Sequence, residues 1–496
     1  MPDYFPWWLV VSHWLNVFFL LLMARSGVEV LSAFPKLYWS DDCPPGREWA
    51  RFSTKTFGAD SRRLWSSQDE EESWSPAVAL PGRKNLGLGR HWHFLGVPFW
   101  VLTGVVYVAL VFTSGHWRYL VPTDWGIVPD SIRAVGTYLH FRLPGPIPGE
   151  PYEPAQKLTY FLLVFVLAPF QIATGLAMSP SVLARWPRYG RLFGGKQGAR
   201  SLHFLGLVAF AGFTLLHTAL VVVHGLPEEL AAIVLGDEQG DRALALVLGL
   251  GIVLVIVLVH VGITLFSLRY RRRTQRWLGF VVEPFERALT RGARSRQRRR
   301  RSTVSPFFRV NGYPPPDADY DAAAAAGFPD YRLAVGGLVD RPVELSLADL
   351  RALGQRRQVT EHNCIQGWTA TAEWAGVPLA RVLELVGPRP DARYVVCYAM
   401  DDKGLTEGEG RSGYFYESIP VDLAHDEQTI LALEMNGAPL PVEHGAPVRL
   451  RVETQLGYKM VKWIRAIELV ADPACIGRGQ GGWREDQLFY AREAGI

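Results

Sequence analysis

One stretch of this sequence combines an uncharged apolar run with two regularly spaced histidines. Residues 201–225 contain no aspartate, glutamate, lysine or arginine, and they are long enough to cross a lipid bilayer as a helix. His203 and His217 lie fourteen residues apart in this run. Fourteen residues of α-helix rise about 21 Å and leave the two side chains within about 40° of one face. Because ionisable side chains at membrane depth are expensive, this pair indicates a function rather than simple packing.

Four further apolar segments have the length of a membrane span and carry partner histidines. The first contains His13, and the second begins with His91 and His93. Since consecutive spans run in opposite directions, His93 and His203 enter from the same side and share a depth. By the same reasoning His13 meets His217 toward the other side. The five predicted spans are residues 5–25, 92–112, 157–178, 203–224 and 245–267.

Paired neutral imidazoles are the usual axial ligands of an electron-transferring haem. We therefore predict two b-type haems, one held by His93 and His203 and the other by His13 and His217. His91 lies only two residues before His93 and is an alternative ligand for the first haem.

The same spans match the pattern of a known family. The letters His-Trp-Leu-Asn occur at residues 13–16, a histidine opens the second span, and the fourth span carries a His-x13-His spacing. This pattern resembles the di-haem cytochrome b subunits of formate dehydrogenases and nickel–iron hydrogenases, of the cytochrome b561 or formate dehydrogenase gamma type. The resemblance covers residues 5–268 and implies electron exchange with a membrane quinone or quinol. This chain differs in its fifth span and in the roughly 65 residues between its first two spans.

Basic residues are distributed unevenly between the two sides of the predicted spans. The segment between the first two spans carries nine lysines and arginines, and residues 269–301 carry thirteen arginines. The positive-inside rule then predicts a multi-pass protein of a bacterial-type plasma membrane whose C-terminal domain faces the cytoplasm. Because the basic tract directly follows a span, we expect it to rest on anionic lipid rather than on nucleic acid.

The composition changes after residue 301. Residues 302–328 are rich in proline, alanine and aspartate and predict a linker. Short β-like runs at 331–335, 394–398 and 448–452 alternate with turn residues, and helices are expected at 346–354 and 378–386. The predicted fold is an α-helical membrane bundle of about five helices plus a C-terminal, β-rich α+β domain.

Cys364 is the cysteine whose surroundings indicate chemistry. The chain has four cysteines and none has C-x-x-C spacing, so an iron–sulfur cluster or zinc knuckle has no support. Cys364 stands in a polar stretch that reads Glu-His-Asn-Cys-Ile-Gln-Gly-Trp over residues 361–368. A thiolate is a soft ligand suited to a soft or high-valent metal, whereas an isolated cysteine is often only a buried thiol.

Motifs on both sides of Cys364 resemble the sulfite oxidase-type molybdopterin domain. They are Leu-Val-Asp-Arg-Pro at 338–342, Leu-Ser-Leu-Ala-Asp-Leu at 345–350, Cys-x-x-Gly-Trp at 364–368, Trp-x-Gly-Val-Pro-Leu at 374–379, Glu-Met-Asn-Gly-Ala-Pro-Leu-Pro at 434–441, His-Gly-Ala-Pro-Val-Arg-Leu at 444–450 and Gly-Tyr-Lys-Met-Val-Lys-Trp at 457–463. The resemblance covers residues 330–472.

This second resemblance implies a cofactor and its ligands. It implies that Cys364 ligates the molybdenum of a molybdopterin cofactor. It further implies phosphate or pterin contacts for Lys459, Lys462, His362, Asn363 and Arg449, and a place facing the metal's oxo groups for Tyr414 or Tyr458.

The residues after Cys364 bear on the substrate. Members of this family that oxidise sulfite place arginines soon after the cysteine, whereas residues 365–369 here read Ile-Gln-Gly-Trp-Thr. The pattern is closer to the bacterial reductases that remove oxygen from sulfoxides. We therefore expect a membrane-bound molybdopterin-dependent oxidoreductase that exchanges electrons between quinone, two haems and molybdenum and acts on a small oxo-donating or oxo-accepting substrate. The alternative is a haem-based electron conduit or redox sensor whose molybdopterin-like domain is non-catalytic.

The predicted domain organisation has four parts. They are a di-haem cytochrome b transmembrane domain at 1–268, a basic juxtamembrane segment and linker at 269–328, a molybdopterin-binding oxidoreductase domain at 329–475, and a C-terminal tail at 476–496.

Overall fold

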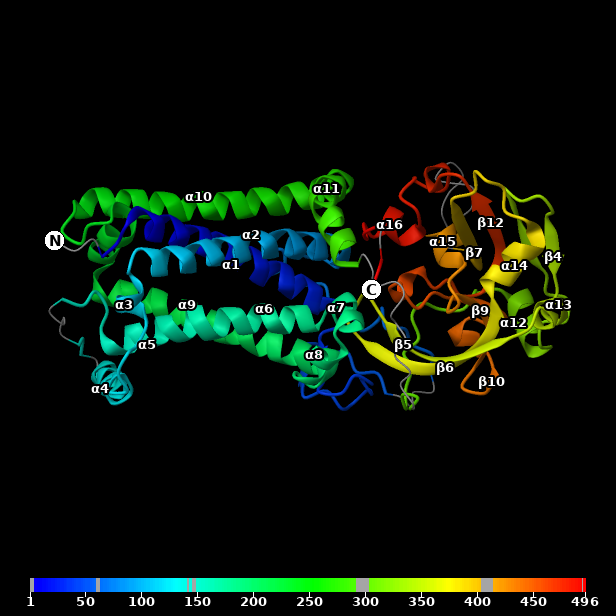
Figure 1. The fold of residues 1–496 in the computed structure, drawn as a ribbon, viewed down its shortest axis with the longest axis horizontal. Helices are drawn as coiled ribbons and strands as arrows, with labels where there is room; N and C mark the ends of the chain where they lie inside the picture. Colours follow the sequence, from blue (N-terminus) through cyan, green and yellow to red (C-terminus); the bar gives the residue numbers. More distant parts are fainter. Residues whose placement is uncertain are drawn as a thin grey trace. The chain divides into compact units, whose positions relative to one another are not determined.

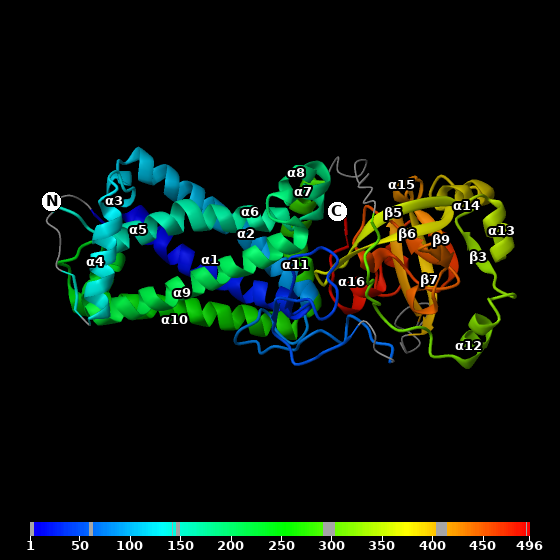
Figure 2. The same cartoon turned by 90° about the horizontal axis from the view of Figure 1, so that it is seen from below.

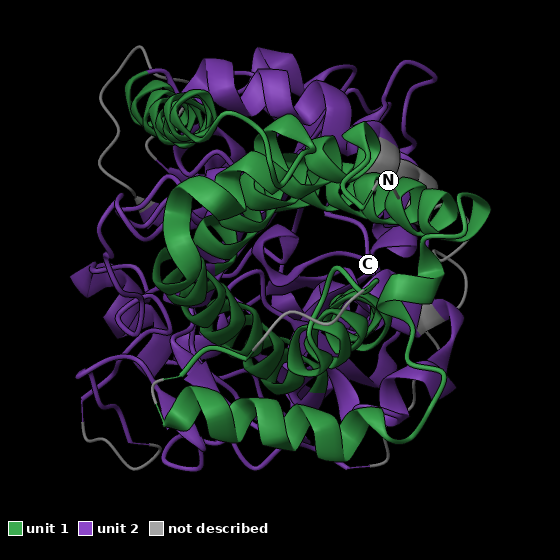
Figure 3. Ribbon diagram, turned by 90° about the vertical axis from the view of Figure 1, so that its left-hand side faces the viewer, with its two compact units in different colours: residues 1–27, 92–176, 199–269 green, residues 28–91, 177–198, 270–496 purple. Residues whose placement is uncertain are grey.

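The structure is a computed structural model of the 496-residue chain. It describes residues 4–58, 63–140, 142–144, 149–290, 303–402, 414–492 and 494–496. These residues form two compact units, each assembled from separate stretches of the chain (Figure 3). Unit 1 comprises Met1–Gly27, Trp92–Leu176 and Ala199–Arg269, and unit 2 comprises Val28–His91, Ala177–Gly198 and Tyr270–Ile496.

Long apolar helices make up unit 1 and run side by side in both views (Figure 1, Figure 2). Within the described residues, five helical stretches are long and apolar enough to span a membrane, as predicted. They are α1 (Trp7–Ser32), α2 (Leu86–Thr113), the continuous stretch Pro154–Met178, the stretch Gly195–Leu235, and α10 (Arg242–Arg269). The third contains α5 (Pro154–Leu162), the π-helical turn η1 (Leu163–Leu167) and α6 (Ala168–Ala177), and the fourth contains α9 (Gly195–Leu230) and η2 (Ala231–Leu235).

The fourth span is interrupted near its end. Gly225 has φ of 122°, a conformation that glycine adopts without steric cost, and Pro227 follows inside the same helix. The proline has no amide hydrogen to donate, so the helix kinks here rather than continuing straight. Shorter helices complete the connections, namely α3 (Trp117–Leu120), α4 (Ile127–Leu139), α7 (Pro180–Arg185) and α8 (Pro187–Arg191).

Two five-stranded sheets form the body of unit 2 within the part of the chain that the structure describes. The first has the order β10-β9-β6-β5 with β11 paired to β9, and the second has the order β4-β3-β12-β7-β8. Only the β12–β3 pair is parallel among these. The strands are β3 (Leu333–Gly337), β4 (Val343–Leu345), β5 (Arg356–Asn363), β6 (Thr369–Pro378), β7 (Tyr394–Asp402), β8 (Tyr414–Pro420), β9 (Ile430–Met435), β10 (Ala438–Pro439), β11 (Arg449–Arg451) and β12 (Ile464–Val470).

The main core of unit 2 brings residues of both sheets together with one helix. Val395 and Ile467 from the second sheet cluster with Leu431 from the first and with Leu383 on α14, and all four are buried. Full burial of such a side chain stabilises the fold by about 1.5–3 kcal/mol. Unit 2 includes α7 and α8. After the last span it continues with α11 (Arg271–Thr290), α12 (Ala318–Ala325), α13 (Leu347–Ala352), α14 (Leu379–Val386), α15 (Val421–Ala424) and α16 (Trp483–Gln487), and a short ribbon pairs β1 (Lys36–Leu37) with β2 (Ala50–Arg51).

The fold class agrees with the prediction, whereas the division of the chain is different from the predicted boundaries. The segment between the first two spans belongs to unit 2 together with the C-terminal domain. The predicted linker 302–328 contains α12, and the predicted tail 476–496 contains α16. Much of the basic tract, residues 291–301, lies outside the described residues.

Candidate functional site

Four histidines of unit 1 face one another in the two predicted pairs. The ring centroids of His93 and His203 are 6.5 Å apart, and those of His13 and His217 are 6.3 Å apart. Two imidazoles that bind opposite sides of one metal at about 2 Å per bond have centroids about 6 Å apart. Both pairs therefore have the spacing that a bis-histidine metal centre requires.

The alternative ligand His91 lies elsewhere. Its Nδ1 donates to the carbonyl oxygen of Gly87, one turn earlier in α2, at 2.7 Å. His91 is buried within unit 2, whereas His93 belongs to unit 1 and faces His203. The geometry favours His93 over His91 as the partner of His203.

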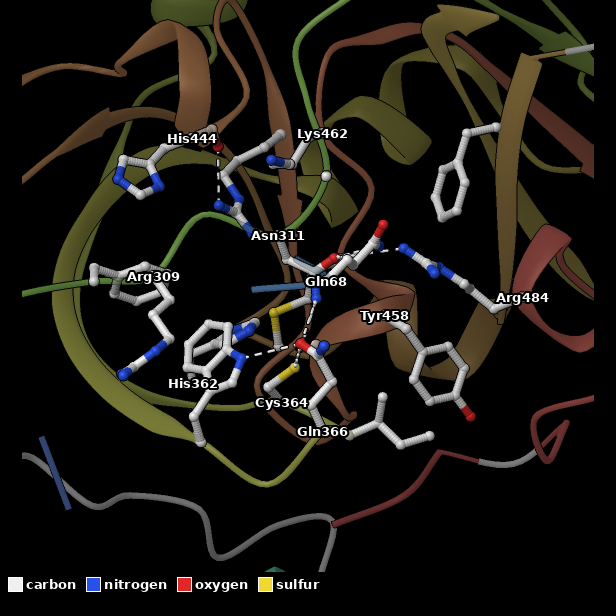
Figure 4. Close-up of a pocket in the computed structure, with 18 of the residues that line it drawn as sticks. Gln68, Arg309, Asn311, His362, Cys364, Gln366, His444, Tyr458, Lys462 and Arg484 are labelled. Atoms are coloured by element: carbon white, nitrogen blue, oxygen red, sulfur yellow. Dashed lines mark hydrogen bonds between the residues drawn. The ribbon is translucent and has the colours of Figure 1, made fainter. Parts of the chain in front are cut away.

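Cys364 occupies the turn between β5 and β6 and lines a pocket of unit 2 (Figure 4). The Cys364 amide donates to the Trp368 carbonyl at 3.1 Å, and the Gly367 amide donates back to the Cys364 carbonyl at 3.1 Å. Gly367 has φ of 116°, a backbone conformation that would be strained in a residue with a side chain. This tight turn holds the Cys364 side chain in the pocket wall.

Amide side chains surround the Cys364 sulfur. Asn311 Nδ2 lies 3.6 Å from Sγ, and Gln366 Oε1 lies 3.4 Å from it. Gln366 is fixed in turn by Ser67 Oγ, which donates to its Oε1 at 2.7 Å, and by Glu71 Oε1, which accepts from its Nε2 at 2.7 Å. Burial raises the pKa of the Cys364 thiol to about 11, so the protein alone keeps it protonated at neutral pH. A bound metal cation is what converts such a thiol to the thiolate.

The same pocket contains an arginine, Arg449, that forms no ion pair among the described residues. Arg449 and Arg451 both stack over the Trp374 ring, with guanidinium carbons 4.7 and 4.5 Å from its centroid. Glu453 neutralises Arg451, with Oε2 at 2.7 Å from Nη2. Arg449 donates only to the His444 carbonyl at 2.9 Å, and its Nε has no partner among the described residues. Burial and the neighbouring Arg451 lower the pKa of Arg449. An anionic ligand beside the guanidinium would raise this pKa again.

The predicted site residues divide into those that line the pocket and those that do not. His362, Cys364, Arg449, Lys462 and Tyr458 line it. The Lys462 ammonium donates to the Glu443 carbonyl at 2.9 Å. Burial, and then Arg451, lower the pKa of His362 well below its ordinary value, so its imidazole is neutral.

Three other predicted residues do not line the pocket. Asn363 accepts from Lys196 Nζ at 3.0 Å. The Lys459 ammonium is buried between Glu417, at 3.0 Å, and Glu485. These two carboxylates raise the pKa of Lys459 against the effect of burial. The geometry therefore gives no support to a phosphate contact by Lys459, and Tyr414 also lies outside the pocket, with Arg465 stacked on its ring.

Several lining residues were missed because they come from distant parts of the chain. Gln68 and Glu71 belong to the segment between the first two spans, Asn311 to the predicted linker, and Arg484 to the predicted tail (Figure 4). Other lining residues, such as Gln366, Trp368 and His444, stand inside the motifs quoted above and were recognisable from sequence. Arginines therefore reach this pocket although none follows Cys364 directly.

Comparison with known proteins identifies both parts of the chain. Residues 4–236 match the family model of prokaryotic cytochrome b561, and residues 321–475 match that of the oxidoreductase molybdopterin binding domain. The chain joins a cytochrome b561 domain to a molybdopterin-binding oxidoreductase domain. Haem b and molybdenum–molybdopterin are accordingly its cofactors, as predicted.

Similar proteins include subunits of one reductase. YedZ1 of Azospira oryzae, named provisionally as a subunit of protein-methionine-sulfoxide reductase, is 37% identical over 188 residues, which are 38% of this chain and 63% of that protein. The catalytic subunit MsrP of protein-methionine-sulfoxide reductase from Xanthomonas axonopodis pv. citri is 31% identical over 153 residues, 30% of this chain and 48% of that subunit. A nitrate reductase (NADPH) from Fusarium oxysporum is 30% identical over 169 residues, 29% of this chain and 18% of that enzyme. The chain thus spans less than two thirds of the length of each relative.

The residues present fit both cofactors. No group of three histidine, cysteine, aspartate or glutamate side chains that could hold a bare metal ion occurs in the described ranges. Facing histidine pairs and a single cysteine are instead donor sets that complete the coordination of a metal already bound by an organic ligand. The unpaired Nε of Arg449 suits an anionic cofactor in the Cys364 pocket.

Proposed function

We propose that this protein is a membrane-bound molybdenum oxidoreductase that exchanges electrons between the quinone pool, two b-type haems and a molybdenum centre. The observation that carries the proposal is the Cys364 pocket, which combines a buried thiol with an arginine that forms no ion pair among the described residues, in a chain that also contains two facing histidine pairs. The cofactors supply the electron transfer and the oxygen-atom exchange. The protein orients them, excludes water and supplies protons.

Sulfoxide reduction is the reaction we favour. The relatives named above as parts of a protein-methionine-sulfoxide reductase support this substrate class. The reaction consumes two electrons and two protons and converts a sulfoxide to a thioether and water. Glu71 lines the pocket, and burial raises the pKa of its carboxyl above the ordinary value, so Glu71 holds a proton on its carboxyl to a higher pH than a solvated glutamate does.

A Cys364→Ser variant tests the catalytic role of the pocket. We expect it to retain haem and fold but to lose oxygen-atom transfer, because an alcohol is a harder and less acidic ligand than a thiol. Methyl-viologen-coupled turnover of sulfoxides, N-oxides and nitrate by the full-length protein measures this loss. Wild-type protein that carries haem but neither molybdenum nor pterin would instead favour the electron conduit or redox sensor.

A His203→Ala variant tests the haem pairing. We expect this variant to lose about half of the haem, because one of the two proposed iron sites loses an axial ligand while the His13–His217 site is left intact. The pyridine haemochrome assay gives haem per chain, with Thr214→Val on the same helix as control. Full haem content in His203→Ala would refute the pairing.

The assembly of unit 2 from three separate stretches of the chain supports five membrane crossings. Its three stretches, 28–91, 177–198 and 270–496, form one compact body and so share one side of the membrane. Two spans separate each stretch from the next, and α1 alone separates the first from the N-terminus. The side of the membrane that holds unit 2 also carries the basic residues counted above. The positive-inside rule therefore supports a cytoplasmic C-terminal domain.

Protease treatment of right-side-out spheroplasts tests this sidedness. We expect residues 330–472 to stay uncut until the cells are lysed, because the domain is enclosed by the plasma membrane. Cleavage within this range before lysis would place the domain outside. A periplasmic marker protein that is degraded in the same sample serves as the control.

We also propose that α11 lies on anionic lipid. Only Tyr270 separates α11 from the last span, and the helix buries Leu278 while leaving Trp277 and Phe280 77% and 83% exposed. Arg276 is exposed beside them. Aromatic rings flanked by arginine are typical of a helix that lies in the membrane interface.

A spin label at residue 280 tests this contact. In vesicles that contain anionic lipid, a label on Phe280→Cys in a Cys475→Ser background should collide with oxygen more than with a water-soluble nickel complex, because oxygen concentrates in lipid. The matched control is a label on Arg357→Cys, at another exposed position of unit 2. Equal nickel accessibility at the two positions would exclude the lipid contact.

A further inference from the structure

The imidazoles of His93 and His203 each contact a hydroxyl group on a neighbouring span. Ser26 Oγ on α1 lies 3.1 Å from His93 Nδ1, and Thr174 Oγ1 on α6 lies 3.0 Å from His203 Nδ1. Ser26 and Thr174 are both fully buried. The two histidines that face each other thus have the same kind of partner on their outer nitrogens.

The hydroxyl groups of Ser26 and Thr174 also lie within hydrogen-bond distance of carbonyl oxygens in their own helices. Ser26 donates to the Leu22 carbonyl at 2.8 Å, and Thr174 donates to the Phe170 carbonyl at 2.9 Å, each one turn earlier in its own helix. A hydroxyl group has a single proton, so toward the imidazole its oxygen can only accept. We therefore assign the proton of each imidazole to Nδ1, which leaves the lone pair on Nε2. This is the tautomer in which Nε2 can bind a metal.

The two sites are also alike in the residue that follows each hydroxyl side chain. Ser26 and Thr174 are both followed by glycine, Gly27 and Gly175. A Cβ built on these glycines would lie 3.6 Å from the Cε1 of His93 and 3.5 Å from the Cε1 of His203. Each imidazole edge therefore lies directly against the helix that supplies its hydroxyl.

The other histidine pair is surrounded by aromatic rings, those of Trp14, Tyr160 and Phe213. Among the described residues, neither the His13 ring nor the His217 ring forms a hydrogen bond. His217 stacks on Phe213 with ring centroids 5.4 Å apart, and His13 meets Trp14 edge-on at 5.4 Å. The two pairs therefore differ in the one feature that most directly alters the donor strength of an imidazole.

We propose that Ser26 and Thr174 are positioning residues that fix the Nδ1–H tautomer of His93 and His203 and lower the reduction potential of the haem between them. The proposal rests on the proposed haem pairing. A hydrogen bond accepted from Nδ1–H moves electron density toward Nε2, which then stabilises ferric over ferrous iron. Each of the two hydrogen bonds accordingly lowers the potential of the His93–His203 haem relative to the same haem without that bond.

The variants Thr174→Val and Ser26→Ala test this assignment. Valine keeps the shape of threonine without its hydroxyl, and Thr174→Ser keeps the hydroxyl. Spectroelectrochemical titration of the full-length protein should resolve two haem steps, and the step that disappears in His203→Ala belongs to the His93–His203 haem. We expect Thr174→Val and Ser26→Ala to move this step alone to higher potential and to alter its low-spin ferric electron paramagnetic resonance signal. Thr174→Ser should leave both unchanged.

A matched control excludes a general effect of removing a hydroxyl from the bundle. Thr214 donates to the Phe210 carbonyl at 2.8 Å on the same helix as His203. Thr214→Val should leave both potentials at their wild-type values. Loss of haem in Thr174→Val but not in Thr174→Ser would equally support a required hydroxyl.

Three outcomes would overturn the proposal. They are unchanged potentials in both hydroxyl-free variants, a shift confined to the other haem, or loss of the site in Thr174→Ser as well as in Thr174→Val. Full haem content in His203→Ala would refute the haem pairing itself, so failure of the pairing and failure of the hydroxyl assignment give different results.

Discussion

The absence of water in the bilayer interior is the constraint on which unit 1 depends. Each polar group at membrane depth needs a partner from the protein, because an unsatisfied one costs several kcal/mol. Arg25 illustrates this, since its guanidinium reaches Thr264 at 2.9 Å and His260 at 3.2 Å on α10. Ser26 and Thr174 bond simultaneously to a helix carbonyl and to an imidazole. Histidines that would be costly in isolation are thereby arranged as facing pairs.

Buried charge has the corresponding role in unit 2. Glu70 accepts from Lys36 and, at 3.0 Å, from Arg309, so it joins the segment between the first two spans to the one after the last span. Lys459 between Glu417 and Glu485 joins the C-terminal segment to the second sheet. Removing one member of such a buried group typically costs about 3–5 kcal/mol. These pairs hold the segments that carry Glu71, Asn311 and Arg484 around the Cys364 pocket.

Arg449 departs from this pattern, and it connects stability with function. Its charge is buried beside Arg451, yet its Nε has no partner among the described residues. A protein tolerates such a charge where an anion completes the balance. The molybdopterin domain match identifies the cofactor, and the unpaired Arg449 suits the negative charge of that cofactor. The thiol of Cys364, which burial keeps protonated, also needs a metal to become a ligand.

Local patterns determined much of this protein from sequence alone. Apolar length gave the five spans, and the alternating direction of consecutive spans gave the His93–His203 and His13–His217 pairs. The motifs around Cys364 gave the second domain. Tertiary structure decided the rest, since Glu71, Asn311 and Arg484 reach the pocket only through long-range packing that leaves no local periodicity. It also decided that Lys459 turns toward two carboxylates, because a buried ammonium is placed by its nearest counter-charges and not by its position in a motif.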